Sequence, residues 1–304
     1  MRSNASQAVV AAPDTPAALT LLSDYKELLK PGITAFVVVM AAAGYVLAVP
    51  GPIEWAALLG LMVGTGLTGG GAGALNHVVE RRHDARMART ARRPVSSGRM
   101  GVAHAVTYAL GCVAVGAAVL AATTNALTTG LALATVALYV GVYTPLKRTT
   151  VHNTLVGAVP GALPALGGVA AATGGVGAVG WSIFAILYLW QLPHFYALAW
   201  MYRQDYRDGG FRMLPSGPSG ERRLAGLVLG ATLLLLVAGV LPAAVGQAGP
   251  LFMVGMAAIG TAFTIPAFSF FSEPTDDRAR RLLLASIAYV PAFFVLVVVD
   301  FLFR

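Results

Sequence analysis

Nine long apolar runs, separated by charged or Pro/Gly-rich breaks, constrain the fold of this chain more than any other feature. A helix of about 20 apolar residues is long enough to cross the roughly 30 Å hydrocarbon core of a bilayer. Apolar residues make up 57% of the 304 residues and charged residues only 11%, which excludes an ordinary soluble protein. We therefore predict an all-α integral membrane protein. Its nine transmembrane helices are expected at 32–50, 54–76, 101–122, 125–144, 154–173, 178–200, 223–245, 250–271 and 282–302.

The segment before the first run is polar and carries three acidic residues, Asp14, Asp24 and Glu27. It lacks the apolar core and the small-residue cleavage site of a signal peptide, so we expect the first span to be retained. The predicted division is a cytoplasmic N-terminal segment at 1–31 and a single transmembrane domain at 32–304.

The basic residues predict the orientation, because Lys and Arg are retained on the cytoplasmic side of a membrane. With the N-terminus inside, 20 of the 21 basic residues precede the first run or follow the second, fourth, sixth and eighth runs, and Arg304 is the exception. We expect a multi-pass protein of the inner (plasma) membrane with its N-terminus and these loops in the cytoplasm. The net charge of +8 then reflects topology, and no nucleic-acid partner is expected.

An acidic motif lies where the second run ends. Asn76, Glu80 and Asp84 are spaced at i, i+4 and i+8, which places their side chains on one face of a helix that leaves the membrane. Magnesium prefers oxygen ligands and commonly combines one or two carboxylates with phosphate oxygens. The motif therefore predicts a magnesium site for a diphosphate substrate.

A basic loop follows this motif directly and contains Arg89, Arg92 and Arg93. Guanidinium groups suit phosphate oxygens and carboxylates alike. These arginines could bind the same diphosphate, or they could only fix the topology and contact anionic lipid headgroups.

A second basic loop follows the fourth run and contains Tyr143, Lys147, Arg148 and Asn153. Two cations and several hydrogen-bonding groups could close over an anionic leaving group. The alternative is a positively charged turn between two spans.

A second acidic motif follows the sixth run. Asp205 and Asp208 are spaced to share a helix face, so a second acidic helix end could hold the same diphosphate through magnesium. The alternative for both residues is a surface salt bridge.

The sixth run itself contains His194, and Tyr202 lies just beyond its end. Ionisable groups inside a membrane are candidate functional residues, although a histidine with a satisfied packing role is the alternative. Tyr202 and the other aromatic residues around His194 could line a pocket for a planar ligand or form the interfacial aromatic belt.

These motifs resemble the UbiA superfamily of intramembrane prenyltransferases, and within it the heme-farnesylating branch. Four stretches carry the resemblance, at 24–31, 76–94, 143–161 and 190–215. Two departures stand out. Glu80 occupies a position where the family usually has Asp, and the second motif offers only Asp205 and Asp208 instead of a fuller Asp-rich repeat.

The resemblance implies a helical bundle whose central cavity opens near the cytoplasmic face, and transfer of farnesyl from farnesyl diphosphate to a vinyl group of heme B, with water added. It implies Mg²⁺ as the cofactor, membrane lipid as the surroundings, and heme A synthase or oxidase assembly factors as candidate protein partners. The implied catalytic residues are Asn76, Glu80, Asp84, Arg89, Arg93 and Lys147; the substrate-binding residues are Arg92, Arg148, Tyr143, Asn153, His194 and Tyr202; the metal ligands are Asn76, Glu80, Asp84, Asp205 and Asp208.

Two other functions fit parts of the pattern. A UbiA-type enzyme that prenylates a quinone precursor or another aromatic acceptor predicts a fuller second acidic motif than this chain has. A transporter or lipid-binding membrane protein predicts polar groups near the middle of the bilayer, on broken helices. Here the polar residues gather at one side of the membrane, which favours the prenyltransferase.

Overall fold

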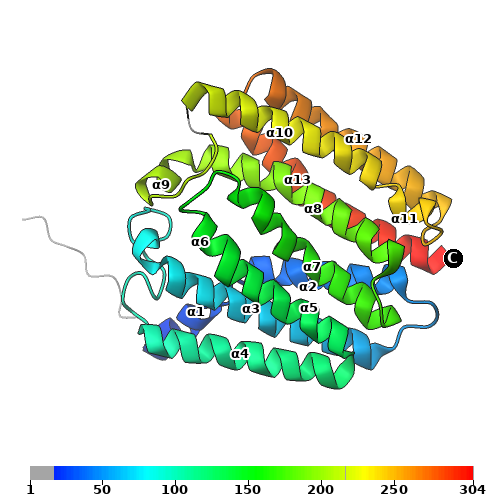
Figure 1. Ribbon diagram of the computed structural model, residues 1–304, viewed down its shortest axis with the longest axis horizontal. Helices are drawn as coiled ribbons and strands as arrows, with labels where there is room; N and C mark the ends of the chain where they lie inside the picture. The colour runs from blue at the N-terminus through cyan, green and yellow to red at the C-terminus, as the bar shows by residue number, and fades with distance from the viewer. Residues whose placement is uncertain (1–16, 216, 304) are drawn as a thin grey trace, which may run out of the picture.

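The computed structural model describes residues 17–215 and 217–303 and folds them into helices joined by short connections (Figure 1). In the described part of the chain, nine helices are long and apolar enough to cross a membrane, which confirms the predicted number. Arg2, Asp14 and Arg304, on which parts of the topology argument depend, lie outside the described residues.

The first helix, α1, precedes the spans, α9 lies between two of them, and α11 completes the span that α10 begins. The bounds are α1 (Ala17–Leu28), α2 (Pro31–Ala48), α3 (Trp55–Asp84), α4 (Val102–Thr123), α5 (Ala126–Ala137), the π-helix η1 (Leu138–Tyr143), α6 (Thr144–Leu146), α7 (Asn153–Thr173), α8 (Gly177–Met201), α9 (Arg203–Asp208), α10 (Gly217–Ala238), α11 (Leu241–Ala244), α12 (Pro250–Ser272) and α13 (Asp276–Phe303). The α5, η1 and α6 segments form one continuous span over Ala126–Leu146.

Three helices extend well beyond the apolar runs that predicted them, and one of these, α10, begins at Gly217 where the prediction began at 223. The prediction ended the second span at residue 76, but α3 continues to Asp84 because its polar last turns are held by contacts with neighbouring segments. The prediction began the last span at 282, whereas α13 begins at Asp276. Asp276 and Asp277 lie in its first turn, where negative charge is favourable next to the helix dipole.

Small residues allow the central helices to pack closely. A side chain on Gly168 of α7 would collide with the carbonyl oxygen of Ala41 in α2, and one on Gly44 would collide with the carbonyl oxygen of Ala165. Inside a membrane such backbone approach supplies dispersion contacts where the hydrophobic effect between helices is weak. Glycine at these positions therefore sets the distance between α2 and α7.

The helices lie side by side in one bundle, with α3, α4 and α5 along one side, α10 and α12 along the other, and α2, α7 and α8 between them (Figure 1). Large apolar side chains such as Leu59, Val254 and Phe268 remain exposed on the outer helices, as expected for a surface in contact with lipid. The ends of α1, α3 and α6 and the short helix α9 gather at one end of the bundle, where the candidate site lies.

Candidate functional site

The first acidic motif is buried at the end of α3. Asn76, Glu80 and Asp84 are 1%, 4% and 0% exposed, respectively, and the helix continues without a break through all three. Because α3 reaches beyond its apolar run, it carries the two carboxylates to the same end of the bundle as the basic loops. The predicted helical face is thus present.

Each member of the motif contacts a cation from a different segment. The Nζ of Lys30, between α1 and α2, donates to Oδ1 of Asn76 at 2.6 Å. The Nζ of Lys147, after α6, lies 2.9 Å from Oε1 of Glu80. A guanidinium nitrogen of Arg93, in the α3–α4 connection, donates to Oδ2 of Asp84 at 2.7 Å. Such pairing is what makes buried charges tolerable, since an isolated buried charge is very costly.

The two lysines differ electrostatically because their partners differ. Burial and the nearby Arg93 cation lower the pKa of Lys30 to about 7, since its partner is the neutral amide of Asn76. Burial would also lower the pKa of Lys147, but the Glu80 carboxylate together with Tyr143 and Tyr139 outweighs burial and raises that pKa well above its ordinary value. Lys147 is therefore a fixed positive charge, and Lys30 is held in its charged form only weakly.

The two carboxylates of the motif suit a magnesium site whose remaining ligands come from the substrate. Oδ1 of Asp84 is buried and has no hydrogen-bond partner in the described chain, so one carboxylate oxygen is free to accept a ligand. Among the residues that the structure describes, no three His, Cys, Asp or Glu side chains lie close enough together to hold a metal ion. Glu80 and Asp84 would thus hold Mg²⁺ only with phosphate oxygens and water completing its shell, which is its common mode.

The two aspartates of the second acidic motif lie in different environments. Asp205, in α9, faces the α3–α4 connection, where Nε of Arg89 lies 3.9 Å from its Oδ2. The Arg89 guanidinium also lies over the ring of Tyr202, at 4.8 Å from the ring centre. Asp208, in contrast, is exposed and accepts a hydrogen bond of 2.9 Å from Gln204. Asp205 is therefore next to the predicted basic loop, whereas Asp208 lies at the surface.

The loop after α6 is held against the loop after α9. The backbone N–H of Arg212 donates to the carbonyl of Lys147 at 2.7 Å, and the Asn153 amide donates to the carbonyl of Arg212 at 2.8 Å. The rings of Tyr143 and Phe211 flank the Lys147 ammonium at 4.7 and 5.9 Å. Asn153, predicted to bind substrate, therefore contacts protein backbone and positions the loop that carries Lys147.

Three predicted residues lie outside this charge cluster. Arg92 is exposed, and its carbonyl accepts a hydrogen bond from Arg99. Arg148 has a buried Nε without a hydrogen-bond partner in the described chain. His194 lies in α8 and shares a hydrogen bond of 2.8 Å with Ser286 of α13.

The surroundings of His194 are aromatic. Its ring stacks on Trp190 at 5.2 Å, and Trp190 in turn stacks on Phe36 of α2 at 4.9 Å. These contacts connect three helices, α2, α8 and α13, and none of them involves the acidic motif. The structure therefore places His194 in the body of the bundle and apart from the charge cluster.

Several residues around the site are missing from the predicted set. Lys30 precedes α2 directly, in a stretch that carried the family resemblance, and the structure adds its contact with Asn76. The imidazole of His83 shares a hydrogen bond of 2.7 Å with the carbonyl of Gly209, which ties α3 to the α9 loop. His77 is buried beside the motif. The only sequence signal for the two histidines is their place within 76–84.

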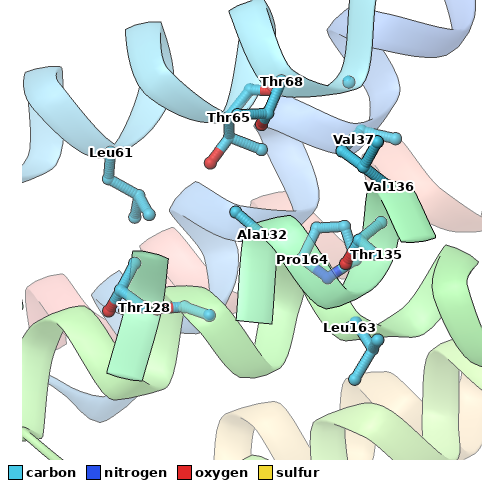
Figure 2. A pocket seen from close by; sticks show the side chains of 12 residues that line it. Val37, Leu61, Thr65, Thr68, Thr128, Ala132, Thr135, Val136, Leu163 and Pro164 are labelled. Atoms are coloured by element: carbon cyan, nitrogen blue, oxygen red, sulfur yellow. Dashed lines mark hydrogen bonds between the residues drawn. The ribbon is translucent and has the colours of Figure 1, made fainter. Parts of the chain in front are cut away.

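Two cavities border α3, and the first of them lies next to the acidic motif. An open cleft of about 620 Å³ lies between α1, the start of α2 and the α3–α4 connection, with Lys30, His77 and Arg93 in its wall. The second, of about 20 Å³, is narrow and lies among α2, α3, α5 and α7 (Figure 2). Its wall is mainly apolar but includes Thr65 and Thr135, and it has room for about one water molecule.

Comparison with known proteins identifies related chains. The sequence model of the UbiA prenyltransferase family matches residues 37–297. A protoheme IX farnesyltransferase from Salinibacter ruber is 47% identical over 92% of this chain and 99% of its own, and one from Solibacter usitatus is 38% identical over 92% and 99%.

Related solved structures share the fold. A structure of digeranylgeranylglyceryl phosphate synthase has a TM-score of 0.75 at 15% identity, covering 93% of this chain and 99% of its own. A UbiA homolog from Archaeoglobus fulgidus bound to GPP and Mg²⁺ has a TM-score of 0.62 at 17% identity, covering 90% and 99%.

Proposed function

Because this chain belongs to the UbiA prenyltransferase family, we propose that it transfers a farnesyl group from farnesyl diphosphate to a vinyl group of heme B, with addition of water, to give heme O. The names of the two relatives, which match nearly their whole length, support heme as the acceptor. The observation that carries the proposal is the buried cluster in which Asn76, Glu80 and Asp84 each contact one cation, namely Lys30, Lys147 and Arg93, respectively.

This cluster suits a leaving diphosphate. Glu80 and Asp84 would hold Mg²⁺, and the metal would supply positive charge next to the phosphate oxygens as the carbon–oxygen bond breaks. The GPP and Mg²⁺ bound to the Archaeoglobus fulgidus homolog support this pairing of ligands. Lys147 and Arg93, now paired with the carboxylates, would turn toward the phosphate oxygens and stabilise the charge that develops there.

The remaining steps depend on exclusion of bulk water. Cleavage of the allylic carbon–oxygen bond leaves an allylic cation, which the electron-rich vinyl carbon of heme attacks. The new carbocation next to the porphyrin then takes up one water molecule and releases a proton, which completes the hydroxyethylfarnesyl group. The buried end of α3 would protect the first cation until the vinyl carbon reaches it.

Several finer assignments belong to the same proposal. The basic loops support an orientation in an inner (plasma) membrane with the site toward the cytoplasm. Residues 32–304 would form one catalytic domain, preceded by the cytoplasmic segment 1–31. His194 and its aromatic neighbours would contact the porphyrin, and heme A synthase or oxidase assembly factors would receive the product.

The test is a reconstituted reaction. Purified protein in lipid nanodiscs is incubated with heme B, farnesyl diphosphate and Mg²⁺, and heme O is sought by mass spectrometry. Parallel reactions lack Mg²⁺, lack farnesyl diphosphate, or replace heme B with a quinone precursor such as 4-hydroxybenzoate. Product from heme B alone supports the proposal. Prenylation of 4-hydroxybenzoate without heme O would instead assign the chain to the aromatic-acceptor branch, and hydrolysis of farnesyl diphosphate without either product would refute both.

A further inference from the structure

The open cleft beside α3 has the composition of an anion site. Its wall contains four cationic side chains and one acidic side chain, namely Lys26, Lys30, Arg89, Arg93 and Glu27. The excess of positive charge attracts anions, and two of these cations, Lys30 and Arg93, also contact the acidic motif of α3. The cleft is therefore next to the proposed diphosphate site and shares part of its wall.

The start of α2 adds backbone donors to this wall. Pro31, Gly32 and Ile33 line the cleft and form the first turn of an 18-residue helix. Pro31 has no N–H, but the N–H groups of Gly32 and Ile33 lie in this first turn, where such groups lack partners within the helix and carry the positive end of its dipole, so they favour a bound anion. Space beside Gly32 is open, which leaves this turn accessible.

His77 is the independent sign of a ligand. Its side chain is 1% exposed and forms part of the cleft wall, and neither ring nitrogen has a hydrogen-bond partner in the described chain. Lys30 and Arg93 are the cations whose charges act on its ring. A buried polar group without a partner is costly, and a ligand that hydrogen-bonds to it removes that cost.

The chemistry of the wall distinguishes between two kinds of anion. Glu80 and Asp84, the candidate metal ligands, do not line the cleft, and its one carboxylate, Glu27, lies 3.6 Å from a guanidinium nitrogen of Arg99, so cations and N–H donors dominate the wall. Carboxylates need no metal and bind well to cations and N–H donors. Resting on the proposed function, which supplies heme as the acceptor, we propose that this cleft binds the propionate carboxylates of heme B and that His77 donates a hydrogen bond to one of them.

This placement orients the acceptor. The propionates and the vinyl groups lie on opposite edges of the heme macrocycle. Propionates held at the end of the bundle by Lys30 and His77 therefore direct the vinyl edge toward the membrane interior, where the farnesyl chain lies. Because Lys30 and Arg93 also contact the α3 motif, both substrates bind against one shared set of charges.

The test compares heme B with its dimethyl ester, in which both carboxylates are masked. Dissociation constants are measured by absorbance titration in nanodiscs, without farnesyl diphosphate, for the wild type, His77→Leu and His77→Gln. Since a hydrogen bond to a charged group is worth about tenfold in affinity, His77→Leu should weaken heme B binding about tenfold and leave ester binding unchanged. His77→Gln, which keeps an N–H donor, should recover part of the loss.

Controls separate this role from the alternatives. His152→Leu, in an exposed loop away from the cleft, should bind both porphyrins as the wild type does. An equal loss for heme B and its ester would overturn the proposal, as would a raised KM for farnesyl diphosphate with unchanged heme binding. A His77→Leu effect that vanishes when phosphatidylglycerol is omitted from the nanodiscs would assign the cleft to lipid headgroups. If the wild type makes no heme O but still discriminates acid from ester through His77, the reaction assignment fails and the cleft assignment stands.

Discussion

Replacing Lys147 with methionine should destabilise the protein through the carboxylate that it leaves behind. The Lys147 and Glu80 side chains are 14% and 5% exposed and their charged atoms lie 2.9 Å apart. With an effective dielectric constant of about 20, Coulomb's law gives an attraction of about 6 kcal/mol at this separation. Desolvation of both groups offsets part of it. Removing one partner of a buried pair still costs about 3–5 kcal/mol, because an unpaired charge remains.

A double-mutant cycle isolates this interaction. Lys147→Met should lower the thermal midpoint by at least about 6 °C, since 1 kcal/mol corresponds to roughly 2 °C or more in a chain of this size. Glu80→Gln should cost less, because the Lys147 ammonium, with 14% of its side chain exposed, can move toward water. The double variant should be more stable than Lys147→Met alone, because no buried carboxylate is left unpaired.

The assay is thermal unfolding of the detergent-solubilised protein followed by tryptophan fluorescence. A matched cycle uses Arg203 and Asp276, which lie 2.8 Å apart in a pair whose Asp276 side chain is 67% exposed. That cycle should give a coupling of at most about 1 kcal/mol. If the Lys147 and Glu80 substitutions are additive, or if both cycles give the same small coupling, the reasoning from burial is refuted.

Three further predictions concern the site and the bundle. Asp84→Asn should abolish heme O formation while leaving membrane insertion intact, because it weakens a proposed metal ligand; near-normal turnover by a well-expressed variant would contradict this. Asp205→Asn should raise the Mg²⁺ concentration needed for half-maximal activity and Asp208→Asn should not, since only Asp205 faces the basic loop; equal effects in rate assays would count against a second metal contact. Gly168→Ala should destabilise the α2–α7 packing by about 1–3 kcal/mol, whereas Gly130→Ala, with open space around it, should not; thermal midpoints compare the two.

Much of the fold was predictable from the sequence because every segment that crosses a membrane must be long and apolar. Length and apolarity locate the nine spans, since lipid imposes one requirement on every segment. The spacing of Asn76, Glu80 and Asp84 likewise predicts one helical face, because helical periodicity is local. Where charges rather than apolarity decide a boundary, the apolar run is shorter than the helix: it ends too early for α3 and begins too late for α13.

The partners across the bundle were not predictable from one sequence. Lys30 lies 46 residues from Asn76, and no local pattern indicates that their side chains meet. The same holds for His194 and Ser286, which are 92 residues apart and pair only because α8 packs on α13. The sequence likewise could not distinguish Asp205 from Asp208, because the difference depends on a residue from another segment: Arg89 lies next to Asp205.

The ligand-free charge cluster accounts for how the site can remain folded without metal. Two buried carboxylates at the end of α3 would repel each other and lose hydration, and the cations from three separate segments offset both costs. On the proposed function, Mg²⁺ would replace the lysine and arginine as the partner of the carboxylates, and the diphosphate would replace the carboxylates as the partner of Lys147 and Arg93. With both ligands bound, each buried charge would again have a partner of opposite sign. Glu80 contacts Lys147 from within α3, and its side chain would be long enough to reach a metal ion after the exchange.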